Sequence, residues 1–176
     1  DVKNNGGNIA INGDLNGHLV NSNGTANIAG NITTISDSEH GDAAVDVYGG
    51  TVTVSGNVSL DSKKGGDAVS ILHDVNTDVT INGNITSKSS DTTRKDGKND
   101  DKIRSVYSNG IGIESDGGEK NVTVKGSVNV SSNAFATGIS VEQYDVPDDD
   151  DTGVSKSTVN ITTGNISVNA PKETHD

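Results

Sequence analysis

The chain repeats a short pattern of alternating apolar and polar residues that breaks at a glycine and then resumes. The pattern reads apolar-x-apolar-x-Gly, then Asn, Asp or Ser, then apolar. Its copies occupy residues 9–15, 26–32, 52–58, 79–85, 122–128 and 159–166, and the last of them is aligned with one extra residue before Gly164. Because strict alternation places successive side chains on opposite faces of a strand, each copy predicts two short strands that meet at a glycine corner.

A third alternating run precedes the later copies, at residues 44–47, 68–71, 111–113 and 138–141. Three short strands cannot enclose an apolar face alone, whereas repeats stacked about 4.8 Å apart let each strand pair with its equivalent in the next repeat. The pattern therefore predicts an all-β fold, a parallel β-helix of about six rungs. An antiparallel sandwich, which also alternates along strands between turns, is the alternative.

Inward side chains at equivalent positions of stacked rungs are expected to touch one another. Two such columns are predicted, Val54, Ile81 and Val124 in one and Val58, Ile85 and Val128 in the other. At the corners, a ladder of side-chain amides that bond turn backbone from rung to rung is predicted for Asn31, Asn57, Asn84 and Asn165. Two long polar stretches, 87–105 and 142–157, are expected to protrude as insertions from a single domain over residues 1–176.

Composition agrees with this fold and narrows the class of partner. The chain contains 22 Gly, no Cys and no Trp, and its formal net charge is -12. Glycine and asparagine are favoured in turns because both tolerate positive φ. The acidic balance opposes binding to nucleic acid. Since no apolar stretch approaches the roughly 20 residues that cross a bilayer, membrane insertion is not expected either.

Two phrases carry a resemblance to a known group of proteins. They are T-V-T-V-S-G-N-V, which ends at Val58, and D-V-T-I-N-G-N-I, which ends at Ile85. Together with the other copies they resemble bacterial surface adhesins and autotransporter passengers, whose fold is the right-handed, pectin-lyase-like β-helix. The resemblance implies a secreted or cell-surface bacterial protein, of which this chain is a segment. It also implies a structural or adhesive role, with a host or cell-surface protein or a glycan as partner.

Members of that group also include polysaccharide-cleaving or polysaccharide-binding proteins and passive stalks, so these two functions stay open as alternatives. Cleavage would require clustered carboxylates or a cation beside a basic residue. Carboxylates such as Asp46 and Glu114 occur singly in the pattern, and the arginines Arg94 and Arg104 both fall in the first insertion. We therefore predict a protein that is not an enzyme and has no catalytic residues.

The protruding insertions are the expected contact surface, and four of their residues are candidates for binding. Arg94 and Arg104 lie within the first insertion, Tyr107 follows it, and Tyr144 lies within the second. Tyrosine is enriched at binding surfaces because its ring is apolar and its hydroxyl forms hydrogen bonds. The alternative interpretation is that the tyrosines only anchor the loops.

The second insertion also contains a run of carboxylates, Asp148, Asp149, Asp150 and Asp151. Carboxylate oxygens are ligands that Ca²⁺ accepts, so the run is a candidate calcium site. A solvated charge run is the competing interpretation, because like charges repel one another. No other cofactor is expected.

The ends of a β-helix present unpaired strand edges and apolar interiors. The residues after Val168 are too polar to cover a rung. We expect that end to be covered by further sequence or, in the isolated segment, by end-to-end association with a second copy.

Overall fold

A computed structural model describes residues 1–176 apart from 74, 97–98, 144–156 and 172–176. The described residues form three parallel sheets of six strands and one two-stranded antiparallel sheet, and they contain no helix. The prediction of an all-β parallel β-helix with about six rungs is confirmed. The sandwich alternative is wrong, because neighbouring strands in all three large sheets run parallel and in register.

Each rung contributes one strand to each large sheet. Sheet A contains β1 (Val2–Asn5), β4 (Leu19–Ser22), β7 (Asp42–Val47), β10 (Gly66–Ile71), β15 (Tyr107–Ser115) and β18 (Phe135–Gln143). Sheet B contains β2 (Asn8–Ile11), β5 (Gly24–Ile28), β8 (Gly50–Val54), β11 (Thr77–Ile81), β16 (Gly118–Val124) and β19 (Ser157–Thr162). Sheet C contains β3 (Leu15–Asn16), β6 (Ile32–Ser36), β9 (Val58–Ser62), β12 (Ile85–Ser89), β17 (Val128–Ser132) and β20 (Ile166–Asn169).

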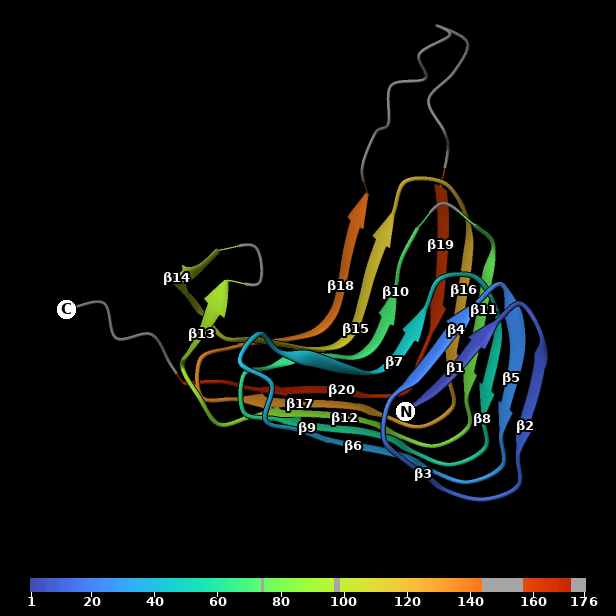
Figure 1. The fold of residues 1–176 in the computed structure, drawn as a ribbon, viewed down its shortest axis with the longest axis horizontal. Helices are drawn as coiled ribbons and strands as arrows, with labels where there is room; N and C mark the ends of the chain where they lie inside the picture. Colours follow the sequence, from blue (N-terminus) through green and yellow to red (C-terminus); the bar gives the residue numbers. More distant parts are fainter. Residues whose placement is uncertain (74, 97–98, 144–156, 172–176) are drawn as a thin grey trace, which may run out of the picture.

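The cross-section of the helix is L-shaped (Figure 1). Sheet C forms the lower layer in this view, and sheet B rises from one end of it. Strands β15 and β18 of sheet A begin above sheet C and then bend upward beside sheet B. The outer face of sheet A is therefore concave at the bend.

Small residues mark this bend. In four consecutive rungs a small residue directly precedes a β-branched one, as Ala44–Val45, Ala68–Val69, Gly110–Ile111 and Gly138–Ile139. A Cβ on Gly110 would lie 2.2 Å from Cγ1 of Val128 in sheet C. Small side chains at these positions thus let sheet A approach sheet C closely, where a larger side chain would overlap its neighbour.

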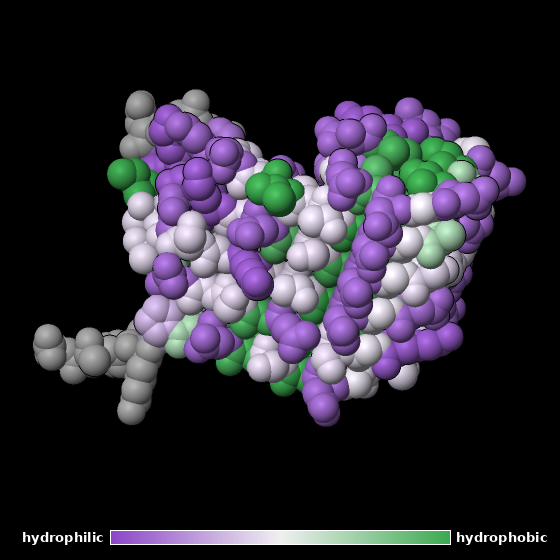
Figure 2. Space-filling view, turned by 90° about the horizontal axis from the view of Figure 1, so that it is seen from below, coloured by the Kyte–Doolittle hydropathy of each residue, from purple (hydrophilic) through white to green (hydrophobic). Residues whose placement is uncertain are grey.

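The core consists of the predicted columns. Ile81 is in register with Val54 and Val124, and Ile85 is in register with Val58 and Val128. All six side chains are at most 1% exposed. Stacking of identical positions thus fills a narrow interior with β-branched side chains, which suit pleated strands. Figure 2 views the outside of sheet C, where hydrophilic and hydrophobic residues run in stripes from rung to rung.

The corners between sheets B and C carry a ladder of hydrogen bonds. The backbone N–H of Asn57 donates to Oδ1 of Asn31 at 2.9 Å, and that of Asn84 donates to Oδ1 of Asn57 at 2.8 Å. The ladder starts at Asp14, whose Oδ1 accepts from the N–H of Asn31 at 2.7 Å. In the fifth rung Ser127 takes the asparagine's place, and its N–H likewise donates to Oδ1 of Asn84 at 2.8 Å. Asn165 therefore has a serine, not an asparagine, as its neighbour in the rung before.

The first insertion begins later than the predicted 87–105. Strand β12 continues in register with β17 as far as Ser89, and Ser87 and Ser89 face the interior. The Ser89 hydroxyl donates to Oγ of Ser132 and accepts from Oγ of Ser108, both at 2.8 Å. Buried hydroxyls that bond one another satisfy their polar atoms without apolar partners, which is why a polar composition was mistaken for a loop.

After β12 the chain forms an antiparallel hairpin of β13 (Thr93–Asp96) and β14 (Asn99–Ser105) before it rejoins the helix at β15. The second insertion, predicted at 142–157, starts after Gln143 at the end of β18 and ends where β19 begins at Ser157. Residues 144–156 of this segment lie outside the described part of the chain.

The last copy of the repeat is shorter than the sequence alignment suggested. Ile161 is in register with Val122, and Thr162 with Thr123. Val159 pairs instead with Lys120. This rung therefore lacks one residue before its corner glycine, rather than carrying an extra one. In this sixth rung Val141, Ile166 and Val168 are exposed, and end-to-end association through them stays a prediction.

Candidate functional site

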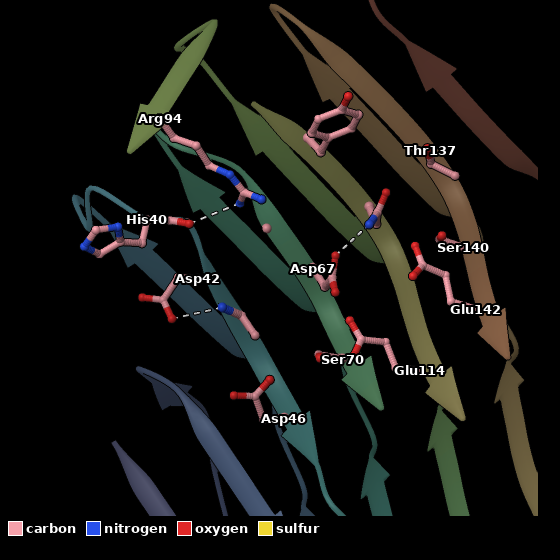
Figure 3. Close-up of a pocket in the computed structure, with 15 residues that line it drawn as sticks. His40, Asp42, Asp46, Asp67, Ser70, Arg94, Glu114, Thr137, Ser140 and Glu142 are labelled. Atoms are coloured by element: carbon pink, nitrogen blue, oxygen red, sulfur yellow. Dashed lines mark hydrogen bonds between the residues drawn. The ribbon is translucent and has the colours of Figure 1, made fainter. Parts of the chain in front are cut away.

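The concave outer face of sheet A holds a cleft with a volume of about 690 Å³ (Figure 3). Strands β7, β10, β15 and β18 form its floor, and the β13–β14 hairpin supplies one wall. The side chains that carry its chemistry are those of His40, Asp42, Asp46, Asp67, Ser70, Arg94, Tyr107, Asn109, Glu114, Thr137, Ser140 and Glu142. Parallel pairing brings these side chains together although they are spread over about a hundred residues of sequence.

These side chains face outward because successive side chains along each strand point alternately into and away from the core on either side of the bend. Val69 and Ile71 of β10 point into the core, where each is fully buried, and Ser70 between them faces the cleft. Ser70 is in register with Asp46 and Gly112, and Gly112 with Ser140. The floor of the cleft is thus a row of short side chains that crosses four rungs.

Carboxylates meet in this cleft. Glu114 and Glu142 are register partners on the neighbouring strands β15 and β18. The charges of Asp46 and Glu114 both act on Asp67. The expectation that rung carboxylates occur singly is therefore wrong, because side chains that are isolated in the sequence become neighbours across the sheet. Figure 3 shows Asp67 in the middle of the group, with Asp46 and Glu114 toward one end and Arg94 and His40 toward the other.

Asp67 occupies space that a glycine in the next rung leaves open. A Cβ on Gly112 would lie 2.3 Å from Oδ2 of Asp67, so a larger residue at position 112 would displace the Asp67 carboxylate. Oδ1 of Asp67 accepts a hydrogen bond from Nδ2 of Asn109 at 2.8 Å. Burial raises the pKa of the Asp67 carboxyl to about 6; the bond from Asn109 opposes this rise, and the charges of Asp46 and Glu114 add to it.

Ser70 is a buried hydroxyl whose side chain faces the cleft. The residue is 7% exposed, and its Oγ has no hydrogen-bond partner among the residues described. This oxygen is not among the fully buried polar atoms that lack a partner, so water in the cleft reaches it, and a ligand that binds there takes the place of that water. This hydroxyl is therefore available to a ligand on the floor of the cleft.

A histidine from the first rung's end holds Asp46 in place. Nε2 of His18 lies 3.0 Å from Oδ2 of Asp46, and both side chains are 18% exposed. This contact orients the Asp46 carboxylate at the N-terminal side of the cleft.

The hairpin wall is attached by polar contacts. Arg94 Nη1 donates to the carbonyl oxygen of His40 at 3.1 Å. The backbone N–H of Lys95 donates to the carbonyl oxygen of Glu39 at 3.2 Å. Lys95 and Glu39 also form an ion pair, which lowers the pKa of the Glu39 carboxyl. Lys64 Nζ donates to the carbonyl oxygen of Thr93 at 3.0 Å. The hairpin, which leaves the helix after the fourth rung, is thereby fixed to the segments that precede the third and the fourth rungs.

Two aromatic rings stack at the edge of the cleft. Tyr107 and Phe135 are register partners, and their ring centroids lie 4.9 Å apart with an interplanar angle of 14°. The two side chains remain 47% and 38% exposed. An exposed, stacked pair presents a flat apolar surface beside the polar floor.

The structure places the predicted binding residues at different sites, and only some of them line the cleft. Arg94 and Tyr107 line the cleft. Arg104 is exposed opposite Arg94 on the hairpin and is not among the lining residues. Tyr144 and the candidate calcium ligands Asp148, Asp149, Asp150 and Asp151 lie outside the described residues. Within the described residues no group of three or more His, Asp or Glu side chains has the geometry to hold a metal ion.

Sequence reasoning missed Asp67, Ser70, Ser140 and Glu142. A signal for Ser70 and Ser140 exists in the third alternating run, once its copies are aligned on the small residue before the β-branched one. This alignment places Asp46, Ser70, Gly112 and Ser140 in one outward row. The row could be found from sequence, but its concavity could not, because that depends on the bend of sheet A.

Among the residues described, no helix is both long and apolar enough to cross a membrane. Comparisons with protein-family models, with curated proteins and with solved structures found no match to this chain. The resemblance to surface adhesins therefore stays a prediction from the repeat pattern.

Proposed function

We propose that this chain is a non-catalytic adhesive module of a secreted or cell-surface bacterial protein, and that it contacts its partner through the sheet A cleft. The observation that carries the proposal is the concave row of small residues from four consecutive rungs, of which Asp46, Ser70 and Ser140 are polar. Ligand sites in proteins are typically concave and of this volume. A spacer that only separated other domains would need no such cleft.

Rigidity supports a binding role for this surface. Strands β7, β10 and β15 are hydrogen-bonded on both sides, so the backbone beneath Asp46, Ser70 and Glu114 cannot shift without breaking ladder bonds. A preorganised surface loses little conformational entropy when a partner binds. The Ser70 hydroxyl and the exposed Tyr107 ring then provide a polar and an apolar contact that are already in place.

A binding screen against glycans and host-surface proteins tests the proposal, with two matched variants. Ser140→Trp fills the cleft at an outward position of β18, whereas Thr123→Trp adds the same bulk at an outward position of β16 on sheet B. We expect Ser140→Trp to abolish binding of any partner found and Thr123→Trp to retain it. Binding that survives Ser140→Trp would place the contact surface elsewhere and refute the proposal.

Polysaccharide cleavage is the second candidate function, favoured by the single observation that Asp67 has a pKa of about 6 close to Asp46 and Glu114. A carboxyl that retains its proton near neutral pH acts as a general acid in glycoside hydrolysis, with a second carboxylate as base or nucleophile. Release of reducing ends from a polysaccharide panel by the wild type, and its loss in Asp67→Asn, would support cleavage. Binding without product release would exclude it.

A further inference from the structure

We infer that the ligand of the sheet A cleft is an amine-bearing glycan, a chain of sugars with free ammonium groups. The inference rests on the proposed function, because it names the chemistry of the partner that the same cleft would bind. It depends on three features of the cleft: its charge, the Ser70 hydroxyl on its floor and its aromatic edge.

The charge of the cleft selects against acidic sugars. Its lining includes the carboxylates of Asp42, Asp46, Asp67, Glu114 and Glu142. Arg94 is the permanently charged cation among the described lining residues, and its guanidinium lies at the hairpin wall, where it donates to the carbonyl oxygen of His40. The whole chain, with these carboxylates included, has a formal net charge of -12. Such a field concentrates cations at the surface and repels uronates and sulfated sugars.

The hydrogen-bonding groups of the floor require a ligand rich in donors. Ionised carboxylates only accept hydrogen bonds, and ammonium and hydroxyl groups supply the donors. The Ser70 hydroxyl, nine-tenths buried and unpaired within the described protein, lies between the carboxylates of Asp46 and Glu114 (Figure 3). A sugar hydroxyl or ammonium placed there would satisfy Ser70 and a carboxylate together.

The aromatic edge favours a glycan over a basic peptide. Sugar rings present an apolar C–H face that packs on an exposed aromatic ring, and the stacked Tyr107 and Phe135 offer such a face. An ammonium over a tyrosine ring gains a further cation–π attraction. A peptide would need separate pockets for its side chains, whereas the row of Ser70, Gly112 and Ser140 is shallow and even. Rungs repeat about every 4.8 Å along the cleft, close to the length of one sugar residue.

The test compares tetrasaccharides of different charge, of which the free and N-acetylated amine forms share one backbone. Calorimetric titration at neutral pH and low salt would use a glucosamine tetramer, its N-acetylated counterpart and a galacturonate tetramer. We expect the glucosamine tetramer to bind at least tenfold more tightly than either of the others. The double variant Asp67→Asn/Glu114→Gln, which keeps side-chain shape, should weaken binding at least tenfold. Asp61→Asn, which removes one charge on the outer face of sheet C, should leave it unchanged.

Three outcomes would overturn the inference. They are equal binding of the free and acetylated tetramers, equal effects of Asp61→Asn and the double variant, and binding of a tetralysine peptide as tight as that of the glucosamine tetramer. If the tetramers fail but another partner binds in a manner sensitive to Ser140→Trp, the ligand class is wrong and the adhesive cleft stands. If no partner shows that sensitivity, the proposed function fails with it.

Discussion

Oδ1 of Asn57 lies only 2.5 Å from the place that a Cβ on Gly83, one rung further on, would occupy. The same oxygen accepts the N–H of Asn84 at 2.8 Å. Glycine at this corner is therefore required by the asparagine of the preceding rung. Positive φ is not the reason, because Gly83 does not have it.

Gly83→Ala should destabilise the domain by about 1–3 kcal/mol, the usual cost of overpacking a fixed site. The new methyl would also lie 2.6 Å from the carbonyl oxygen of Gly56, so rotation of Asn57 alone cannot relieve the clash. Denaturant unfolding measures the change. Gly13→Ala is the matched control at the first corner, where nothing lies within 4 Å of the added Cβ, and it should be close to neutral. Equal losses in the two variants would contradict this account of the corner glycines.

The two faces of β11 should respond in opposite ways to the same substitution. Ile81 is fully buried between Val54 and Val124, so Ile81→Asp places an unpaired carboxylate in the core and should unfold the domain. Thr80→Asp, one residue away on the solvent side, should cost about 1 kcal/mol or less. Circular dichroism and unfolding midpoints distinguish the two. Similar effects would show that the register of sheet B is wrong.

The rungs were predictable because each contains the same apolar-x-apolar-x-Gly pattern, in which Val54, Ile81 and Val124 hold the same position although the intervals between them differ. The cleft was not predictable from the sequence, because it depends on the bend at Ala68–Val69. Two consecutive side chains point inward there and break the alternation. Polar residues were misjudged for a related reason. Ser89 is buried yet satisfied by other serines, and no local pattern separates such a hydroxyl from one in a loop.

Substitution of two buried serines of β12 by alanine should change the free energy of unfolding in different directions. The Oγ of Ser87 is buried without a hydrogen-bond partner, so Ser87→Ala removes an unsatisfied group and should be neutral or stabilising by about 1 kcal/mol. Ser89→Ala instead breaks the bonds to Ser108 and Ser132 and should destabilise by about 1–2 kcal/mol. Urea unfolding of both variants provides the comparison. A larger loss for Ser87→Ala than for Ser89→Ala would refute it.

Deletion of residues 92–102 should leave the β-helix folded. The contacts that the deletion removes, such as the ion pair of Lys95 with Glu39 and the hydrogen bond from Lys64 to the carbonyl oxygen of Thr93, involve exposed or half-exposed groups. Such pairs contribute little to stability, so the loss should be about 1 kcal/mol or less. The deletion also removes Arg94 from the cleft and should alter binding there. Disappearance of the cooperative unfolding transition would show that the hairpin belongs to the core.

Asp67 should make the domain less stable as pH rises from about 4 to 6. Its pKa is raised from 3.8 to about 6 in the folded protein, so in this window the folded state binds its proton while the unfolded state has lost it. Stability falls with pH wherever the folded state binds more protons, and above pH 6 the loss is complete. A shift of this size corresponds to about 3 kcal/mol, which partial solvation of the carboxylate reduces to about 1–2 kcal/mol.

Asp67→Asn tests this sign directly, because asparagine keeps an oxygen that accepts from Asn109 but cannot ionise. We expect the variant to be about 1–2 kcal/mol more stable than the wild type at pH 7 and nearly equally stable at pH 3.5, where the wild-type carboxyl is largely protonated in both states. The free energy of unfolding of each protein is measured across this range, and the wild-type value is subtracted from that of the variant at each pH. The titrations of the other carboxylates occur in both proteins and cancel in this difference. A difference that does not change between pH 3.5 and 7 would show that Asp67 ionises normally in the folded protein.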